Sequence, residues 1–145
     1  LERQLEHYQQ GVRGAHEEDT YGRQMAPMAA ILGSGEAVVD VSAWLASLPA
    51  TQPETTVSGD PGRGAAHYNS CSACHGSRAQ GNEALQAPRL TGLQDWYIRQ
   101  QLENFRRGVR GSHSEDRYGK QMVLMARSVQ NEQSIDDLLS YLNTL

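Results

Sequence analysis

Apolar residues recur along this chain with helical spacing, and we find no convincing run of alternating apolar and polar residues that would indicate a strand. One stripe consists of Ile98, Leu102, Phe105 and Val109, and another of Ile135, Leu138, Leu139, Leu142 and Leu145. Spacings of three and four residues place such side chains on one face of a helix. Gly108 and Gly111 stand on either side of the last residue of the first stripe and are stop signals for its helix, and Asn131 precedes the second stripe as a candidate N-cap. We therefore predict an all-α fold in which each helix buries one stripe.

The same pattern occurs a second time, 97 residues earlier in the chain. Residues 1–48 align with residues 98–145 without a gap, and 19 of the 48 pairs are identical. The match is densest where residues 11–25 meet residues 108–122, and both copies carry a second methionine three residues later, at Met28 and Met125. We predict three segments: residues 1–48 as the second half of a preceding unit, residues 49–62 as a linker rich in Pro and Thr, and residues 63–145 as a complete unit.

Candidate chemistry is concentrated in the run Cys71-Ser72-Ala73-Cys74-His75. Residues three apart on a helix lie on one face, so both thiols can add to the two vinyl groups along one edge of a haem. The adjacent imidazole can then bind the iron. A Cys-x-x-Cys-His run is typical of covalent c-type haem attachment. It occurs once, which predicts one haem c, with its iron, per chain.

Three other interpretations of the two thiols compete with haem attachment. A structural zinc site needs four ligands, and the chain has two cysteines, so two of His7, His16, His67 and His113 would have to complete it. A thioredoxin-like pair normally follows a strand in an alternating βα pattern, which is missing here. A structural disulfide across so short a loop stabilises little and leaves His75 without a role.

Composition limits the partners of the chain. The formal charge is −4 over 145 residues, and residues 1–50 hold three Arg against seven Asp and Glu. No basic stripe with interleaved aromatic residues is present, so we expect no nucleic-acid binding. Arg106, Arg107 and Arg110 are interpreted as a solvated helix end, with a docking patch as the alternative. No apolar run approaches the roughly 20 residues that a membrane span needs. We therefore expect membrane association only through an anchor upstream of Leu1.

The order of parts in residues 60–145 resembles a class I cytochrome c domain: a haem motif after a short helix, the run Ala87-Pro88-Arg89-Leu90-Thr91-Gly92, and a loop with methionines before a final helix. The tandem arrangement is similar to dihaem cytochromes c and to the cytochrome c extension of haem–copper oxidase subunit II. The resemblance implies an all-α fold around one covalently bound haem, with His75 as the proximal iron ligand. It further implies that the Pro88 carbonyl accepts a hydrogen bond from the other His75 nitrogen, and that Gly64 and Tyr68 meet Tyr141 where the first and last helices cross.

The resemblance also implies a distal methionine ligand, and two residues compete for that role. In the resembling families the ligand lies in an irregular loop, which favours Met122 and leaves Met125 to the core. His113 is the outside alternative and is expected to be a loop histidine bonded near Glu115 or Asp116. Arg89 and Trp96 are expected to donate hydrogen bonds to the haem propionates, because buried carboxylates need donors. A turn with a capping box is expected at residues 91–94, opening the next helix.

With two axial protein ligands, the expected function is electron transfer between redox proteins, and a haem–copper oxidase is one candidate acceptor. Covalent haem attachment in bacteria takes place outside the cytoplasm, so the resemblance implies a periplasmic location or the outer face of the cytoplasmic membrane, reached through an export signal absent from this sequence. The alternative function is a haem enzyme or gas sensor whose distal ligand is absent or displaceable.

The partial unit raises a separate question, because its stripes would expose a large apolar patch if they stood alone. Those stripes are Leu1, Leu5, Tyr8 and Val12, and Val38, Val41, Leu45 and Leu48. We expect self-association through residues 1–48, with Met25 unligated. The patch could instead pack on the second unit, or exchange with residues 98–145 of another chain so that Met25 replaces Met122. A third interpretation makes residues 1–50 an interaction element that has lost its cofactor in evolution.

Overall fold

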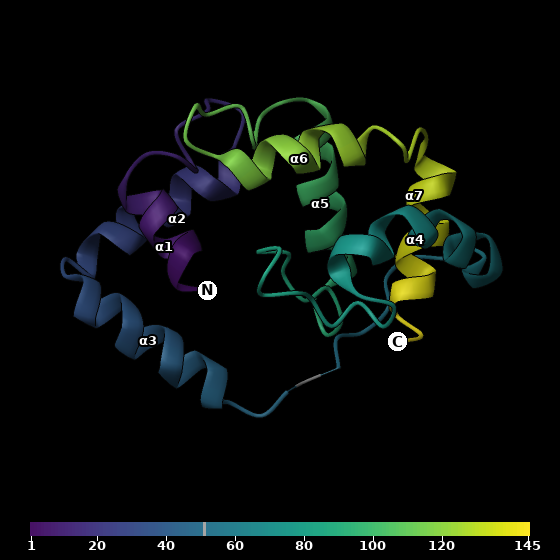
Figure 1. Cartoon of the computed structure of the whole chain (residues 1–145), viewed down its shortest axis with the longest axis horizontal. Coiled ribbons are helices and arrows are strands. Elements are labelled where there is room, and N and C mark those ends of the chain that lie inside the picture. Colours follow the sequence, from purple (N-terminus) through teal and green to yellow (C-terminus); the bar gives the residue numbers. More distant parts are fainter. Residues whose placement is uncertain (51) are drawn as a thin grey trace.

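The computed structural model describes residues 1–50 and 52–145, and the expected linker residue Thr51 lies outside the described residues. Seven helices form the described chain: α1 (Glu2–Gln9), α2 (Thr20–Ile31), α3 (Gly35–Ser47), α4 (Pro61–His75), α5 (Asp95–Arg106), α6 (Arg117–Ala126) and α7 (Glu132–Leu142). One isolated antiparallel bridge joins Asn82 and Ala87. The all-α prediction is thus confirmed. Figure 1 shows α1 to α3 on one side of the molecule and α4 to α7 on the other, joined by the extended linker.

The second unit is organised around the crossing of α4 and α7. Gly64 lies so close to α7 that a Cβ atom built on it would stand 2.0 Å from the Asp137 carbonyl oxygen and 2.7 Å from Cβ of Tyr141. The Tyr68 and Tyr141 rings meet at the same crossing, with centroids 5.5 Å apart. The expected contact of Gly64 and Tyr68 with Tyr141 is therefore present. Only glycine permits this approach of the two helices.

The predicted apolar stripes form the core of this unit. Ile135 and Leu139 are completely buried, Leu138 and Leu142 nearly so, and Ile98 of α5 packs in the same cluster. Phe105 and Val109 are also buried, whereas Leu145 at the end of the stripe is 38% exposed. The stripe of α7 thus ends one turn earlier than the sequence pattern indicates.

Side-chain caps set several of the helix starts. Asn131 accepts a hydrogen bond from the Ser134 N–H at 2.8 Å, as predicted, and Asp60 accepts from the Gly62 N–H at 2.7 Å. Helix α4 therefore begins at Pro61, inside the segment predicted as linker. Asp19 and Asp116 cap α2 and α6 by accepting from the N–H groups of Gly22 and Gly119. These two aspartates occupy equivalent positions in the two copies of the repeat.

Two predictions about local structure are wrong. The residues 91–94 form no capping box, because Thr91 Oγ1 accepts from Arg89 and α5 begins at Asp95. The Asp95 carboxylate is instead held by the linker, where the Thr56 N–H and hydroxyl both donate to it at 2.6 Å. The methionine segment is no irregular loop either, since Met122 lies inside α6. The Asp116 cap starts that helix six residues before Met122.

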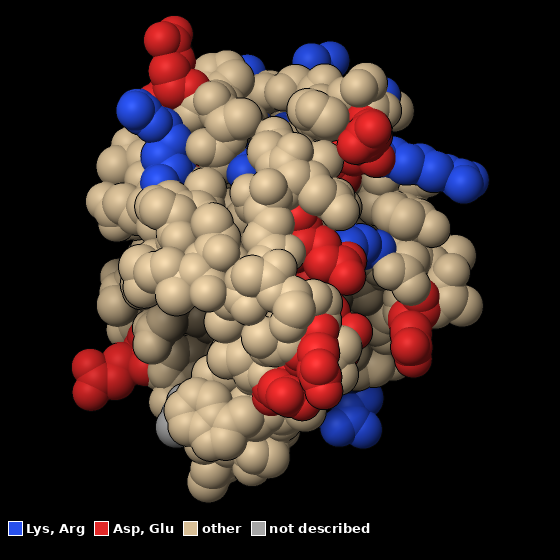
Figure 2. All heavy atoms as spheres, turned by 90° about the vertical axis from the view of Figure 1, so that its left-hand side faces the viewer, with Lys and Arg blue, Asp and Glu red and all other residues tan. Residues whose placement is uncertain are grey.

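The N-terminal half has a small core of its own and leaves other apolar residues uncovered. Leu5 and Tyr8 of α1 pack with Ala29 and Val38 from the other two helices, and all four are buried. Figure 2 shows that uncharged side chains dominate the middle of the face formed by this half. The large apolar residues of α2 and α3 that remain exposed are Tyr21, Met25, Met28, Ile31, Val39, Trp44 and Leu45. The half-unit therefore buries only part of its predicted patch.

Polar side chains join the two halves across α1 and α5. Arg13 Nη1 donates to Gln4 Oε1 at 2.7 Å, and its Nη2 donates to Gln101 Oε1 at 3.0 Å. Arg110 makes the same two contacts in reverse order, to Gln101 at 2.6 Å and to Gln4 at 2.8 Å. Arg13 and Arg110 are equivalent in the repeat, as are Gln4 and Gln101. The two halves thus face each other across an internal two-fold arrangement.

None of the described helices is by itself long and apolar enough to cross a membrane. Helices α2 and α3, which are bent by 116° where they meet, are together long and apolar enough by length and composition alone.

We predict that Asp137→Asn destabilises the protein at neutral pH and that the difference in stability shrinks progressively in acid. Arg63 Nε donates to the buried Asp137 carboxylate at 2.7 Å and the Asp60 N–H donates to it at the same distance. These contacts lower the pKa of Asp137, the Arg63 hydrogen bond most strongly. The pKa of Asp137 is lower in the folded state than the unfolded value of about 3.9. The stabilisation that its charged carboxylate provides is therefore fully present above that pH and is lost as the pH falls towards the folded pKa. Thermal unfolding of both proteins between pH 7 and pH 2 measures it; a difference independent of pH would contradict the assignment.

Candidate cofactor site

The two thiols lie on the last turn of α4, one turn apart. Both are free, with Cys71 half-buried and Cys74 exposed. Burial raises the pKa of the Cys71 thiol. Because they are three residues apart in a continuous helix, both sulfur atoms are presented on the same side of α4. This arrangement suits two thioether bonds to neighbouring substituents of one planar ligand.

His75 ends the helix with a buried and oriented imidazole. The residue is 5% exposed, and its Nδ1 lies 2.8 Å from the Pro88 carbonyl oxygen. Burial lowers the pKa of His75, although the Pro88 hydrogen bond opposes that effect. A neutral imidazole that donates from Nδ1 leaves Nε2 as a lone-pair donor to a metal. The hydrogen bond that the resemblance implied is thus present.

The loop after α4 brings Pro88 to the imidazole. Gly76 ends the helix with φ of +82° and accepts a hydrogen bond from the Tyr68 hydroxyl at 2.7 Å. The buried Ala79 carbonyl then accepts from the Leu90 N–H at 2.8 Å. Burial raises the pKa of Tyr68 to about 12, so this hydroxyl stays a proton donor at physiological pH. The loop is therefore fixed at both ends around His75.

The two methionines of α6 face different surroundings. Met122 is half-buried and lies three residues after buried Gly119 and four before buried Ala126, on the inner face of the helix. Met125 is 36% exposed. The prediction that Met125 belongs to the core is therefore wrong, although a spacing of three residues leaves it close to Met122 on the helix surface. Met25, the equivalent of Met122 in the first copy, is 40% exposed.

The other residues named from the sequence are scattered around this centre. Arg89 is exposed and its Nε donates to the backbone and side-chain oxygens of Thr91. Trp96 is 49% exposed and packs against Tyr21 at 6.0 Å between ring centroids. The Nδ1 atom of His113 accepts from the Glu115 N–H at 3.3 Å, so this residue is a loop histidine as expected.

The predicted arginine cluster does not behave as one solvated helix end. Arg107 is exposed and pairs with Glu18 of the first copy, and Arg106 donates to the Gln130 carbonyl. Arg110 is instead part of the contact between the halves. Charge clustering along the chain did not indicate this role, although Arg13 and Gln4 are identical to Arg110 and Gln101 under the repeat alignment.

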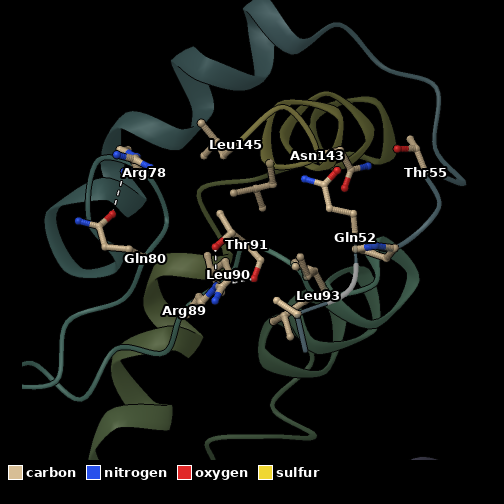
Figure 3. A pocket seen from close by; sticks show the side chains of 15 residues that line it. Gln52, Thr55, Arg78, Gln80, Arg89, Leu90, Thr91, Leu93, Asn143 and Leu145 are labelled. Atoms are coloured by element: carbon tan, nitrogen blue, oxygen red, sulfur yellow. Dashed lines mark hydrogen bonds between the residues drawn. The ribbon is translucent and has the colours of Figure 1, made fainter. Parts of the chain in front are cut away.

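A cavity of about 710 Å³ lies next to the site, between the linker and the second unit. Figure 3 shows Arg89, Leu90 and Thr91 on one side of it, with Thr55 and Asn143 on another. Arg89 and Leu90 line this cavity, but Cys71, Cys74, His75 and Met122 do not. It is therefore separate from the arrangement of thiols and imidazole.

The described residues fit a haem better than the competing interpretations. Among them no group of three or more His, Cys, Asp or Glu side chains could hold a metal ion, which argues against a zinc site. The thiols are free rather than paired, and no strand precedes them. A buried imidazole with a fixed tautomer follows directly. This donor set, two adjacent thiols and one nitrogen, is what covalent haem attachment requires.

Comparison with known proteins decides the family. The family model for cytochrome c matches residues 62–145, more than half of the chain. The chain belongs to the cytochrome c family. It therefore has a class I cytochrome c fold, holds a covalently bound haem c with its iron, and carries electrons through that haem.

Similar proteins add to this cytochrome c assignment. A solved structure of cytochrome c4 from Acidithiobacillus ferrooxidans superposes with a TM-score of 0.77 at 25% identity, covering 100% of this chain and 83% of that one. Two curated relatives are each named thiosulfate dehydrogenase electron acceptor. The one from Stutzerimonas stutzeri (strain A1501) is 45% identical over 42 residues, and the one from Thiomonas intermedia (strain K12) is 46% identical over 43 residues. These matches cover 29% and 30% of this chain, and 19% and 20% of the relatives.

Proposed function

We propose that the haem is attached through thioethers to Cys71 and Cys74 and that His75 and Met122 are its axial iron ligands. The observation that carries this proposal is the buried His75 imidazole, whose Nδ1 is held 2.8 Å from the Pro88 carbonyl directly after the two free thiols. The inner-face position of Met122 on α6 supports its choice over Met125. A His/Met pair leaves the iron without an open position, which suits electron transfer.

Several side chains would tune the bound cofactor. The Pro88 carbonyl raises the basicity of His75 by polarising its Nδ1–H bond. A methionine sulfur favours reduced iron and so raises the reduction potential. Arg89 and Trp96 remain our candidates for the propionates, because both are exposed and the indole N–H makes no hydrogen bond to the described residues. When bound, the haem supplies the one-electron chemistry, and these residues position and shield it.

We predict that intact-mass measurement of protein produced with a haem-attachment system will show one added haem. The motif that attaches it occurs once in the chain. Cys71→Ser with Cys74→Ser should remove the added mass, whereas His67→Gln, on the same helix, should leave it. A mass corresponding to no haem or to two, in the wild-type chain, would contradict the proposed attachment.

We propose that the redox partners are proteins of inorganic sulfur oxidation. The two relatives named as electron acceptors of thiosulfate dehydrogenase support a donor that oxidises a reduced sulfur compound. A haem–copper oxidase is the corresponding candidate acceptor, with the exchange taking place in the periplasm or at the outer face of the cytoplasmic membrane. Stopped-flow reduction of the oxidised protein by such a dehydrogenase tests the donor. Reduction no faster than that of an unrelated class I cytochrome c would contradict it.

We propose that residues 1–48 are the second half of a preceding cytochrome c unit, joined by residues 49–62 to the haem unit of residues 63–145. The cytochrome c4 structure supports this division, since it matches the whole chain and not the second unit alone. The equivalent caps Asp19 and Asp116 and the exchanged Arg–Gln contacts support it as well. Met25 would then stand where the first unit carries its distal ligand.

We predict self-association of this chain through the exposed apolar residues of α2 and α3. Trp44 is 60% exposed on α3, so Trp44→Glu removes apolar surface and adds a charge within that face. Ala43→Glu adds the same charge at the neighbouring exposed position and is the matched control. Sedimentation should show a dimer for the wild type and the control and a monomer for Trp44→Glu and for a chain lacking residues 1–50. A wild-type monomer, or a dimer in the shortened chain, would contradict this surface.

A further inference from the structure

One arginine of the first copy reaches the loop that orients His75. Arg3 is half-buried on α1, and its guanidinium donates to both oxygens of Gln86, to the carbonyl oxygen at 3.0 Å and also to Oε1. The two residues are 83 positions apart in the sequence. The N-terminal end of α1 thus meets the loop between α4 and α5 (Figure 1). Because one rigid donor fork holds two acceptors, the contact fixes the orientation of Gln86 as well as its position.

Gln86 has a backbone conformation that few residues with a Cβ atom adopt. Its φ is +55°, in the left-handed region that favours glycine. Within the loop, its N–H and its Nε2 both donate to the Glu83 carbonyl oxygen, at 2.9 and 2.8 Å. Among the hydrogen bonds of the described residues, those from Arg3 are the ones that reach Gln86 from another part of the chain. Unfavourable conformations of this kind persist where surrounding contacts hold them.

The path from Gln86 to the candidate iron ligand is short. The next residue, Ala87, forms the antiparallel bridge with Asn82 through two hydrogen bonds of 2.9 Å. Pro88 follows, and its carbonyl oxygen lies 2.8 Å from His75 Nδ1. Since peptide units are rigid planes, a displacement of Gln86 moves this carbonyl as well. The guanidinium of Arg3 therefore restrains the acceptor of the His75 hydrogen bond.

The same guanidinium contacts the helix that carries Met122. Its Cζ lies 5.0 Å from the centroid of the Tyr118 ring, a cation–π contact. Tyr118 lies on α6 four residues before Met122, on the same face of the helix. Arg117 also lies over this ring, at 5.8 Å, and is exposed. Arg3 thus joins the loop beside His75 to the helix of the second candidate ligand.

This contact belongs to the first copy alone. Under the repeat alignment Arg3 corresponds to Gln100, whose Nε2 donates to Asn104 on its own helix at 3.0 Å. Arg13 and Arg110, by contrast, exchange equivalent acceptors across the internal two-fold arrangement. The contact of Arg3 with the loop is therefore no by-product of the repeat.

We propose that Arg3 is a positioning residue through which the first copy of the repeat sets the strength of the His75–Pro88 hydrogen bond, and with it the reduction potential of the haem. The proposal rests on the proposed function, in which His75 binds the iron. A firmly held acceptor makes the imidazole a stronger donor and so favours oxidised iron. Loss of the Arg3 contact weakens that hydrogen bond and raises the potential.

Hydrogen exchange on the haem-loaded chain tests the restraint of the loop. The variants are Arg3→Gln and Arg3→Lys, and Arg117→Gln is the matched control because it removes one positive charge beside the same Tyr118 ring. Exchange is followed by mass spectrometry on a peptide that contains Asn82 and Ala87. Their amides should exchange roughly tenfold faster in Arg3→Gln than in Arg117→Gln, since loss of a charge-assisted hydrogen bond corresponds to about that factor.

Potentiometric titration of the same proteins tests the effect on the haem. Removal of a positive charge by itself lowers the potential in both glutamine variants, so Arg3→Gln should have the higher potential of the two. Arg3→Lys keeps the charge but has no fork for both Gln86 oxygens, so its potential should lie above that of the wild type. It also replaces Arg3→Gln if that variant does not fold.

The proposal is overturned if Arg3→Gln matches Arg117→Gln in the exchange rate or in the potential, or if Arg3→Lys has the potential of the wild type. Failure of the proposed ligation by His75 and Met122 would appear in the spectrum of the wild-type chain, whatever the variants do. The exchange rates need no haem signal, so the two failures are distinguishable.

Discussion

Replacing Met122 by Ala is expected to abolish the low-spin spectrum of the bound haem and to lower its reduction potential by on the order of 0.1 V. The physical reason is the loss of a sulfur ligand that stabilises the reduced iron, on the inner face of α6 between Gly119 and Ala126. Optical spectra and potentiometric titration of the purified variant measure both effects.

Met125→Ala and Met25→Ala are the matched controls for this substitution. Both side chains are substantially exposed, so each truncation should leave the spectrum and the potential unchanged and cost well under the roughly 2–5 kcal/mol of a buried Met→Ala change. If Met125→Ala alone removed the low-spin spectrum, Met125 and not Met122 would be the ligand.

Replacing Gly64 by Val is expected to prevent stable folding of the second unit. A Cβ atom at this position would stand 2.0 Å from the Asp137 carbonyl oxygen, and backbone atoms of α7 cannot move aside without opening the core. Overpacking of this kind costs about 3 kcal/mol or more. Circular dichroism and thermal unfolding of the purified variant test the expectation.

Gly35→Ala is the control for that steric argument. A Cβ atom at Gly35 meets nothing within 4 Å, and the residue opens α3 with ordinary helical backbone. Ala there should be neutral or stabilising by about 0.4–1 kcal/mol. A Gly64→Val protein as stable as Gly35→Ala would show that the α4 and α7 crossing tolerates a side chain.

Local sequence patterns predicted the helices of this protein well where one face is buried. The stripes at residues 98–109 and 135–142 and the Asn131 cap depend on residues near one another in the sequence, and all are present. The repeat alignment likewise predicted equivalent helices in residues 1–48, where Ser34 caps α3. The Cys-x-x-Cys-His run placed both thiols and His75 on the last turn of one helix.

The features that sequence patterns missed depend on contacts between distant residues. Helix α5 begins at Asp95, whose carboxylate accepts two hydrogen bonds from Thr56, 39 residues earlier. The role of Arg110 depends on Gln4, 106 residues away, so charge clustering along the chain could not indicate it. Met125 lies three residues after Met122 on the same helix, so its exposure depends on which neighbouring elements cover the end of α6 and not on helical spacing.

We propose that this chain is an electron carrier whose haem iron is held by His75 and Met122. The most direct test is the optical spectrum of this haem-loaded chain through a complete reduction and reoxidation. We predict low-spin iron in both states, a weak near-infrared band of methionine-ligated ferric iron, and full reversibility in one-electron steps. High-spin five-coordinate iron that rapidly binds carbon monoxide would contradict ligation by both His75 and Met122 and favour a haem enzyme or a gas sensor.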